Sequence, residues 1–313
     1  MKNSEQSKVF ENQLKEIWRG VLPFPRIQGD RVQIGSNVEF AKSSIKVKRF
    51  QEFTAWRSLT RGKEPSWIST NAFIQMRNFL NSSKTKVDFG EDPRLFVFAN
   101  QAHAMIQIFD EGKKDIEVCI LNLETGLSFS LHSPFGFNGK NWVPFEFKGE
   151  LHFLYALSPK VILVLREYGN GYTLEKLNFP EKFNPVWEHN LEESIGIYRG
   201  GSPAIQISSD KFCGFSHGIN PNQDIHAHRL GIYSLTMSDQ GLNHIFLTEY
   251  REKFLIDAYG LQIANGKVLM DGSMAIGDIH EIDSQIFNFR MYFELSQVEA
   301  LFGLGGRDHD EKT

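Results

Sequence analysis

The sequence predicts an all-β fold: a five-bladed β-propeller over residues 26–303, with a short helix at each end. Short apolar runs alternate with polar turns from residue 95 onwards, which is the pattern of antiparallel strands. Helical periodicity is almost absent there, which argues against a fold of alternating strands and helices. Residues that open predicted strands also recur every 56 to 61 positions, at Leu95, Leu151, Phe212 and Val268. This interval is about the length of a four-stranded blade.

The N-terminal part supplies a helix and one further blade. Residues 5–22, within an N-terminal segment 1–25, show apolar side chains at three- and four-residue spacing, and Pro23 stops the predicted helix. A second short helix is predicted over residues 70–80. Alternating apolar residues across 31–53 predict edge strands. These strands would form the first blade, and four more would follow from about residue 90.

The remaining strands are predicted from β-branched and aromatic runs bounded by turn residues. Asn265-Gly266 is the strongest hairpin signal, because both residues accept the positive φ of a two-residue turn. A short helix is predicted over 295–301 with Ser296 as its N-cap, and residues 304–313 form a predicted disordered tail. The predicted strands cover residues 95–98, 105–109, 116–120, 151–155, 161–165, 172–177, 212–215, 229–235 and both arms of 261–270.

Composition and charge exclude several classes of protein. The net charge is −4 and basic residues do not cluster, so no nucleic-acid partner is predicted. No apolar run approaches the roughly 18 residues that span a bilayer. The first eight residues lack the pattern of a secretion signal, and Cys119 and Cys213 lie in apolar runs typical of buried thiols. We therefore expect a cytoplasmic protein without a transmembrane segment.

Residues 89–98 combine two carboxylates, a proline and an arginine directly before an apolar strand. Gly90 is expected to permit a tight turn, and Pro93 restricts Asp92 to an extended conformation. The carboxylate of Asp92 is then held in a fixed position where the strand begins. An ion-paired turn at a sheet edge is the structural alternative.

Four further polar clusters occur near the ends of predicted strands. In a propeller the equivalent end of each blade faces one central funnel, so we expect the clusters to converge on one polar pocket. Such a pocket would hold an acid, an aromatic wall and several cations, and would suit a sugar with an anionic group nearby. Each residue also has a structural interpretation, as a turn charge, an ion pair or a core side chain. The clusters are Lys140-Asn141-Trp142, Arg199-Gly200-Gly201-Ser202, Ser216-His217 with His226-Ala227-His228, and Gly277-Asp278.

His226 and His228 also form a candidate metal pair, because residues two apart lie on the same face of a strand. Asp224 is the one further ligand suggested, so neither a metal nor another cofactor is predicted. A glycine-rich phosphate loop and a nucleophile-elbow motif are both absent from the sequence.

In their order along the chain, these motifs resemble those of five-bladed β-propeller carbohydrate-active enzymes. The closest resemblance is to the β-mannoside phosphorylase and hydrolase family and its mannosyltransferase relatives, over about residues 85–285. The matching motifs are Gly90-Glu91-Asp92-Pro93-Arg94, Lys140-Asn141-Trp142 with Pro144-Phe145, Arg199-Gly200-Gly201-Ser202-Pro203, Phe215-Ser216-His217 and Gly277-Asp278.

The resemblance implies that Asp92 is the catalytic acid, which gives its proton to the departing glycosidic oxygen. It implies a sugar or oligosaccharide substrate with phosphate, a sugar 1-phosphate or a nucleotide sugar as its partner. The expected substrate-binding residues are Glu91, Arg94, Asn141, Trp142, Ser202 and Asp278. The expected phosphate- or donor-binding residues are Lys140, Arg199, His217 and His228, because a phosphate needs fixed cations.

The sequence therefore favours an intracellular glycosyltransferase or glycoside phosphorylase. A hydrolase of the same fold is an alternative and would need a second carboxylate, for which Glu91 and Asp278 are the candidates. A non-catalytic glycan-binding propeller is another. The surroundings of Asp92 distinguish them: a buried acid beside cations and a sugar-sized cavity favour an enzyme, whereas an Asp92–Arg94 pair consumed in a turn favours a binding module.

Overall fold

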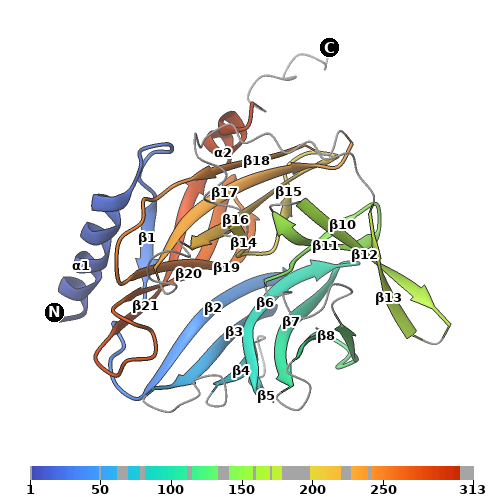
Figure 1. Cartoon of the computed structure of the whole chain (residues 1–313), viewed down its shortest axis with the longest axis horizontal. Coiled ribbons are helices and arrows are strands. Elements are labelled where there is room, and N and C mark those ends of the chain that lie inside the picture. Colours follow the sequence, from blue (N-terminus) through green and yellow to red (C-terminus); the bar gives the residue numbers. More distant parts are fainter. Residues whose placement is uncertain are drawn as a thin grey trace.

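The computed structural model describes residues 2–48, 51–61, 70–77, 82–110, 115–132, 141–157, 160–169, 171–177, 198–219, 227–238 and 241–303. These residues form five antiparallel sheets and two helices, with the sheets arranged around a common axis (Figure 1). The predicted five-bladed propeller with terminal helices is confirmed. In this part of the chain, neither helix is long and apolar enough to cross a membrane.

Blades 1 to 3 are each built from strands that follow one another in the chain. Blade 1 contains β2 (Asn37–Lys48), β3 (Gln51–Thr60), β4 (Thr70–Arg77) and β5 (Ser82–Asp88). Blade 2 contains β6 (Gly90–Phe98), β7 (Gln101–Asp110), β8 (Asp115–Asn122) and β9 (Ser128–His132). Blade 3 contains β10 (Val143–Phe147), β11 (Glu150–Leu157), β12 (Lys160–Tyr168) and β13 (Gly171–Lys176).

The last two blades depart slightly from this plan. Blade 4 contains β14 (Tyr198–Gly200), β15 (Ile205–Gln206), β16 (Lys211–Ile219), β17 (His228–Thr236) and β18 (Leu242–Phe246), and both β14 and β15 pair with β16. Blade 5 contains β19 (Phe254–Ala264), β20 (Lys267–Ile276), β21 (Gln285–Glu294) and the N-terminal strand β1 (Arg26–Gly29). The pairing of β1 with β21 joins the two ends of the chain in one sheet and closes the ring.

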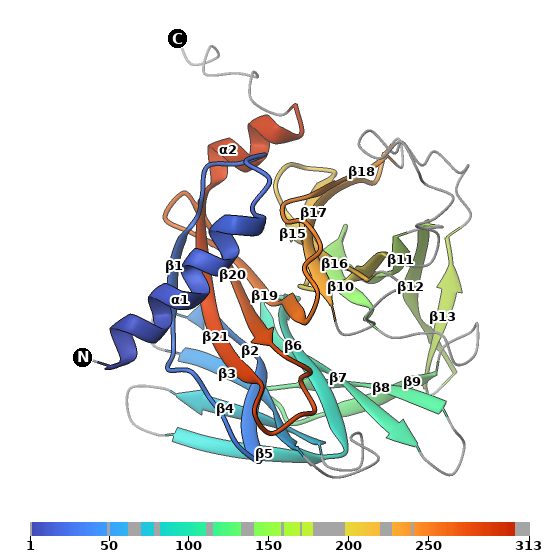
Figure 2. The ribbon, with the colours of Figure 1, turned by 60° about the vertical axis from the view of Figure 1, so that its left-hand side comes forward.

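The helices lie outside blade 5. Helix α1 (Lys2–Ile17) runs beside β1 and β21, and its Phe10 ring stacks on Phe287 at 4.8 Å (Figure 2). Helix α2 (Leu295–Leu301) follows β21 directly. The apolar face of α1 is therefore covered by the blade that the N-terminal strand completes.

Neighbouring blades are held together by apolar clusters. Among the described residues, each of the five blade interfaces has one such cluster. Ile45 and Leu95 belong to the cluster between blades 1 and 2, and Val143 and Phe212 to the one between blades 3 and 4. Burial of these faces supplies the main driving force for assembling the ring.

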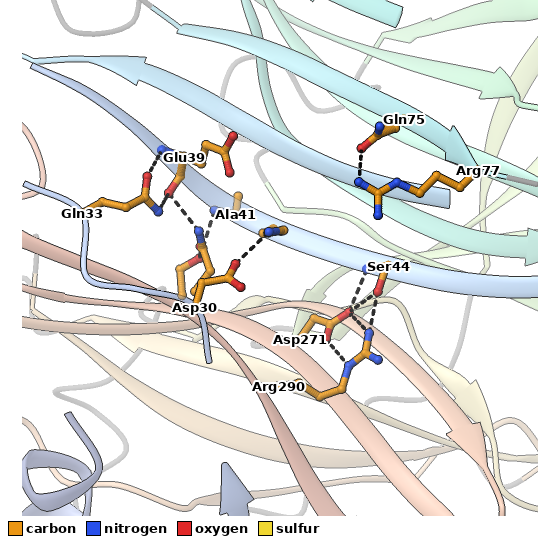
Figure 3. Close-up of polar contacts among 12 residues, drawn as sticks. Asp30, Gln33, Glu39, Ala41, Ser44, Gln75, Arg77, Asp271 and Arg290 are labelled. Carbon is orange, nitrogen blue, oxygen red and sulfur yellow. Dashed lines mark hydrogen bonds and ion pairs between the residues drawn. The ribbon is translucent and has the colours of Figure 1, made fainter. Parts of the chain in front are cut away.

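The interface between blades 5 and 1 also has a polar part (Figure 3). The Asp271 carboxylate accepts a hydrogen bond from the Ser44 backbone N at 2.7 Å and pairs with both Nε and Nη2 of Arg290. Next to it, Ser273 Oγ accepts a bond from the Ala41 backbone N at 3.0 Å. Side chains of blade 5 thus satisfy backbone groups of β2 where the ring closes.

The structure corrects several element predictions. The segment predicted as a helix over 70–80 is strand β4 as far as it is described, because Thr70, Ala72 and Ile74 are buried alternately against neighbouring blades. Helix α1 ends at Ile17, not at Leu22, since the next residue, Trp18, forms a β-bridge with Thr248.

The four residues predicted to mark the repeat do not lie in equivalent strands of their blades. Leu95 lies in β6, the first strand of its blade, whereas Leu151, Phe212 and Val268 lie in strands that follow the first. The first strands themselves begin at Asn37, Gly90, Val143, Tyr198 and Phe254, at intervals of 53 to 56 residues.

The two turn predictions near the C-terminus had different outcomes. Asn265-Gly266 forms the predicted hairpin between β19 and β20, with φ values of 52° and 71°. The N-cap of α2 is Glu294, so Ser296 lies inside the helix.

Candidate active site

The candidate site lies where the first strands of the blades begin. These strands contact one another around the axis, and they carry Asp92 on β6, Arg199 on β14 and Asp257 on β19. Blade 4 adds His217 from β16 and His228 from β17, and blade 1 adds Arg57 from β3. The described part of the site thus draws on blades 1, 2, 4 and 5, with Asn141 preceding blade 3.

Asp92 lies on a β-bulge between Glu91 and Arg94 and has a φ of 42°, which is unusual for a residue other than glycine. One of its oxygens is 3.4 Å from Nη1 of Arg57, and 17% of its side-chain surface is exposed. Backbone strain of this kind is found where the surrounding structure fixes a side chain in a particular direction. The carboxylate is therefore held in place and remains partly open to solvent.

Arg57 organises the acidic pair. Its Nη2 lies 3.2 Å from the Glu91 carboxylate, and its Nε donates to Thr70 Oγ1 at 2.8 Å. Burial lowers the pKa of Arg57, but the charges of Glu91 and Asp92 more than offset this, so its pKa is raised overall. A permanently charged guanidinium thus fixes both carboxylates.

Arg94 forms its hydrogen bonds with other residues than Asp92, although only Pro93 separates the two in the sequence. Its Nη2 donates to Asn141 Oδ1 at 2.8 Å and its Nε donates to the Gly201 carbonyl. Burial lowers the pKa of Arg94, with nearby Asp92 opposing the shift. Within the described part of the chain its Nη1 has no hydrogen-bond partner, which makes it a buried donor available to a ligand.

Asp257 binds two histidines and a tyrosine. Its Oδ1 is 2.7 Å from His228 Nδ1 and 3.6 Å from His217 Nδ1, and its Oδ2 accepts from the Tyr259 hydroxyl at 3.0 Å. Burial would raise the pKa of Asp257, but His217, His228 and these hydrogen bonds outweigh it and hold the pKa well below its usual range. Burial lowers the pKa of His217 to about 3, so this imidazole is neutral at physiological pH.

The same three side chains offer metal ligands. Ligand atoms of His217, His228 and Asp257 lie within 4.8 Å of one another. However, the imidazole rings are almost parallel, 9° apart with centroids at 4.7 Å, whereas a shared metal must lie near the plane of each ring. The charges of Arg94 and Arg199 also act on His217 and would repel a divalent cation.

The other predicted site residues occupy different positions. Trp142 is buried against Phe153 and Tyr155. Ser202 is buried and accepts a hydrogen bond from the Phe215 backbone N at 3.0 Å. Asp278 lies in the turn after β20 and accepts from the His280 backbone N at 2.9 Å. Arg199 is solvent-exposed. Lys140, Asp224 and His226 lie outside the described residues.

Sequence reasoning missed Arg57, Thr70, Asp257 and Tyr259. Arg57 and Asp257 are charged residues inside otherwise apolar strands, Ala55–Leu59 and Leu255–Leu261. A charge in such a run is rarely buried without a partner, and this was the signal that could have identified both. The ion-pair partners of Arg57 and Asp257 lie in neighbouring blades, so they depend on how the blades are arranged.

Comparison with known proteins shows similarity in fold. No protein family and no curated protein matches the sequence. Among solved structures, a GH43_1 enzyme from Xanthomonas citri superposes with a TM-score of 0.51 at 6% identity, over 90% of this chain and 92% of that one. A GH43 β-xylosidase/α-arabinofuranosidase from a compost metagenome gives 0.51 at 7% identity, over 85% and 94%. A hypothetical protein from Leishmania major gives 0.50 at 11% identity, over 93% and 94%. The chain therefore shares the fold of these proteins.

Proposed function

We propose that this protein is a carbohydrate-active enzyme that transfers a glycosyl group to or from a phosphate-bearing partner, with Asp92 as the acid. The proposal rests on the contacts and the solvent exposure of the Asp92 carboxylate. This carboxylate sits on a strained bulge, is held by Arg57 and remains partly exposed, while Arg94 bonds Asn141 and not Asp92. The pattern of an ion pair consumed in a turn, typical of a binding module, is not what surrounds Asp92 among the described residues.

The proposed reaction divides the roles among these residues. Asp92 gives its proton to the leaving glycosidic oxygen as the bond from that oxygen to the anomeric carbon breaks. A phosphate oxygen forms the new bond to the same carbon. Arg94 Nη1, exposed Arg199 and the imidazoles of His217 and His228 would hold the phosphate, whose charge is best stabilised by fixed donors; Arg94, Arg199 and His228 all act electrostatically on His217. Asp257 orients the imidazole of His228 through a hydrogen bond.

A glycoside hydrolase is the second candidate. The fold neighbours named above include a xylosidase, and two further carboxylates, Glu91 and Asp257, accompany Asp92. Hydrolysis needs one of them to activate water or to attack the sugar. Glu91 is buried against Arg57, and Asp257 accepts bonds from His228 and Tyr259, so both carboxylates are already engaged. This arrangement favours transfer involving phosphate.

A donor screen with Asp92→Asn tests the proposal. Sugar 1-phosphates, nucleotide sugars and β-linked oligosaccharides with and without phosphate are supplied, and released phosphate, nucleotide, sugar 1-phosphate and free sugar are measured. We expect phosphate-dependent turnover that falls by about a hundredfold or more in Asp92→Asn, the usual cost of losing a general acid. Asparagine tolerates positive φ, so the bulge should persist.

Asp88→Asn is the matched control, because Asp88 is exposed at the end of β5 and pairs with Lys86. Its turnover should equal that of the wild type. Turnover that releases free sugar and needs no phosphate would identify a hydrolase. Unchanged turnover in Asp92→Asn would contradict the role of Asp92.

A further inference from the structure

We infer that a groove between blades 2 and 3, at the end of the propeller opposite Asp92, is a second site that binds a neutral carbohydrate chain. The groove has a volume of about 530 Å³ and is bounded by the turn after Phe98 in blade 2 and by Gly149 in blade 3. Asp92 lies near the start of β6 and Phe98 ends the same strand, so the full length of β6 separates the groove from the candidate active site.

One wall of the groove is aromatic and spans both blades. Phe129 of β9 and Tyr172 of β13 approach to 4.4 Å between ring centroids. Tyr172 is 47% exposed and neighbouring Leu127 is 73% exposed, although both border the groove. Exposed aromatic faces with one polar end are suited to cover the C–H face of a sugar ring while its hydroxyls reach polar partners.

Polar residues of blade 2 that also border the groove supply those partners. The Gln101 and Asn122 amides form a pair, with Asn122 Nδ2 donating to Gln101 Oε1 at 2.7 Å, and both residues border the groove. Burial lowers the pKa of His103, which is held by the Gln101 carbonyl at 3.1 Å, so this imidazole is neutral at pH 7. Amides and a neutral imidazole both donate and accept hydrogen bonds, as a polyhydroxylated ligand requires.

The charges select against anionic ligands. Arg166 borders the groove together with Glu150 and Glu167, and it is already paired with Glu150 and Glu175. Two carboxylates against one neutralised guanidinium disfavour phosphates and nucleic acids. An uncharged chain with hydroxyl groups and apolar faces fits this set of side chains. The site goes beyond the proposed function, because it would hold a glycan away from the bond that reacts.

Calorimetric titration of the full chain with neutral oligosaccharides of mannose, xylose and glucose tests this inference. The titrations use Asp92→Asn protein, so that turnover does not contribute to the heat. We expect at least one oligosaccharide to bind, and Tyr172→Ala to weaken its binding about tenfold, in line with the loss of an aromatic contact. Gln101→Ala provides a second, milder change among the polar residues that border the groove and should also weaken binding.

Tyr168→Ala is the matched control, because Tyr168 lies on the same hairpin, is 79% exposed and does not border the groove. It should bind as tightly as the parent protein. Three outcomes would overturn the inference: no binding across the panel, equal affinity of Tyr172→Ala and Tyr168→Ala, or binding that is lost only on substitutions around Asp92. Loss of turnover in Asp92→Asn with intact binding in the groove would separate this site from the catalytic proposal.

Discussion

The bulge in β6 decides what the Asp92 side chain can do. In a regular strand, residues two apart face the same side, so the sequence suggests that Asp92 and Arg94 pair with each other. The register shift between Glu91 and Arg94 breaks this relation. Arg94 turns to Gly201 and Asn141, and Asp92 meets Arg57. One irregular backbone position thus gives the two charged side chains Asp92 and Arg94 different partners.

His244 should make the protein less stable in mild acid. It is partly buried and bonded to Ser216 Oγ at 2.7 Å, and desolvation lowers its pKa to about 3. Below about pH 6.5 the unfolded chain binds a proton there that the folded chain rejects, so stability is lost as pH falls towards 3. The slope of about 1.4 kcal/mol per pH unit amounts to roughly 2 kcal/mol at pH 5.

His244→Gln should reduce this slope, because the amide can still bond Ser216 and carries no titrating group. Free energies of unfolding from urea titrations at pH 7.5, 6 and 5 would measure it. His217 has a pKa lowered in the same way, so part of the slope remains. His132→Gln, at an exposed position on β9, is the control. Identical slopes in His244→Gln and wild type would refute the assignment.

Gly90 shows how strand packing, and not a turn, can require glycine. The sequence suggested that it permits a tight turn, but positive φ occurs at Phe89 and Asp92, on either side of Glu91 and Gly90. A Cβ at Gly90 would lie 2.7 Å from Ala72 Cβ and 3.0 Å from Ile106 Cγ2. The absence of a side chain therefore lets β6 approach its neighbours directly before the acidic pair.

We expect Gly90→Ala to reduce stability by roughly 1–3 kcal/mol, the usual cost of overpacking, and to lower turnover because β6 carries Asp92. Gly149→Ala is the comparison: its φ is +77° and no atom lies within 4 Å of the added Cβ, so it costs backbone strain alone. Urea unfolding and steady-state kinetics would be measured for both. Equal turnover in the two variants would show that the contact with Ala72 does not position the acid.

Strands and turns were predicted correctly where residues close together in the sequence determine them. The Asn265-Gly266 turn and the apolar runs of blades 2 to 5 were predicted because turn residues and β-branched residues act within a few positions. The segment after Thr70 was mistaken for a helix because Phe73, Ile74 and Arg77 also fit helical spacing. Its burial against blade 2 alternates from residue to residue, and this tertiary contact determines the strand.

Site residues could be predicted only where they lie close together in the sequence at the beginning of one strand. Asp92 and Arg94 stand in one motif, and the repeat implied that such clusters meet on the axis. The approach of Arg57 to Glu91 and that of Asp257 to His228 join different blades, and the sequence does not give the rotation and register between blades. The partners of Asp92 and of the histidines therefore had to come from the structure.

Closure of the ring should depend on Asp271. It bonds Arg290 across strands β20 and β21, and it receives the Ser44 backbone N of blade 1, so its loss leaves a half-buried guanidinium and a backbone donor without their acceptor. We expect Asp271→Ala to lower the free energy of unfolding by about 3 kcal/mol, as for other broken buried pairs.

Asp30→Ala provides the comparison at the same interface, because Asp30 pairs with Lys42 at 2.7 Å but is half-exposed. Its loss should cost less than about 1 kcal/mol. Urea titration of both variants measures the difference, and limited proteolysis shows where the chain first opens. Since β1 pairs with β21 and β2 contacts both β20 and β21 near this pair, cleavage of Asp271→Ala should begin in blades 1 and 5. Equal stability of the two variants would mean that the apolar cluster between these blades closes the ring without the polar contacts.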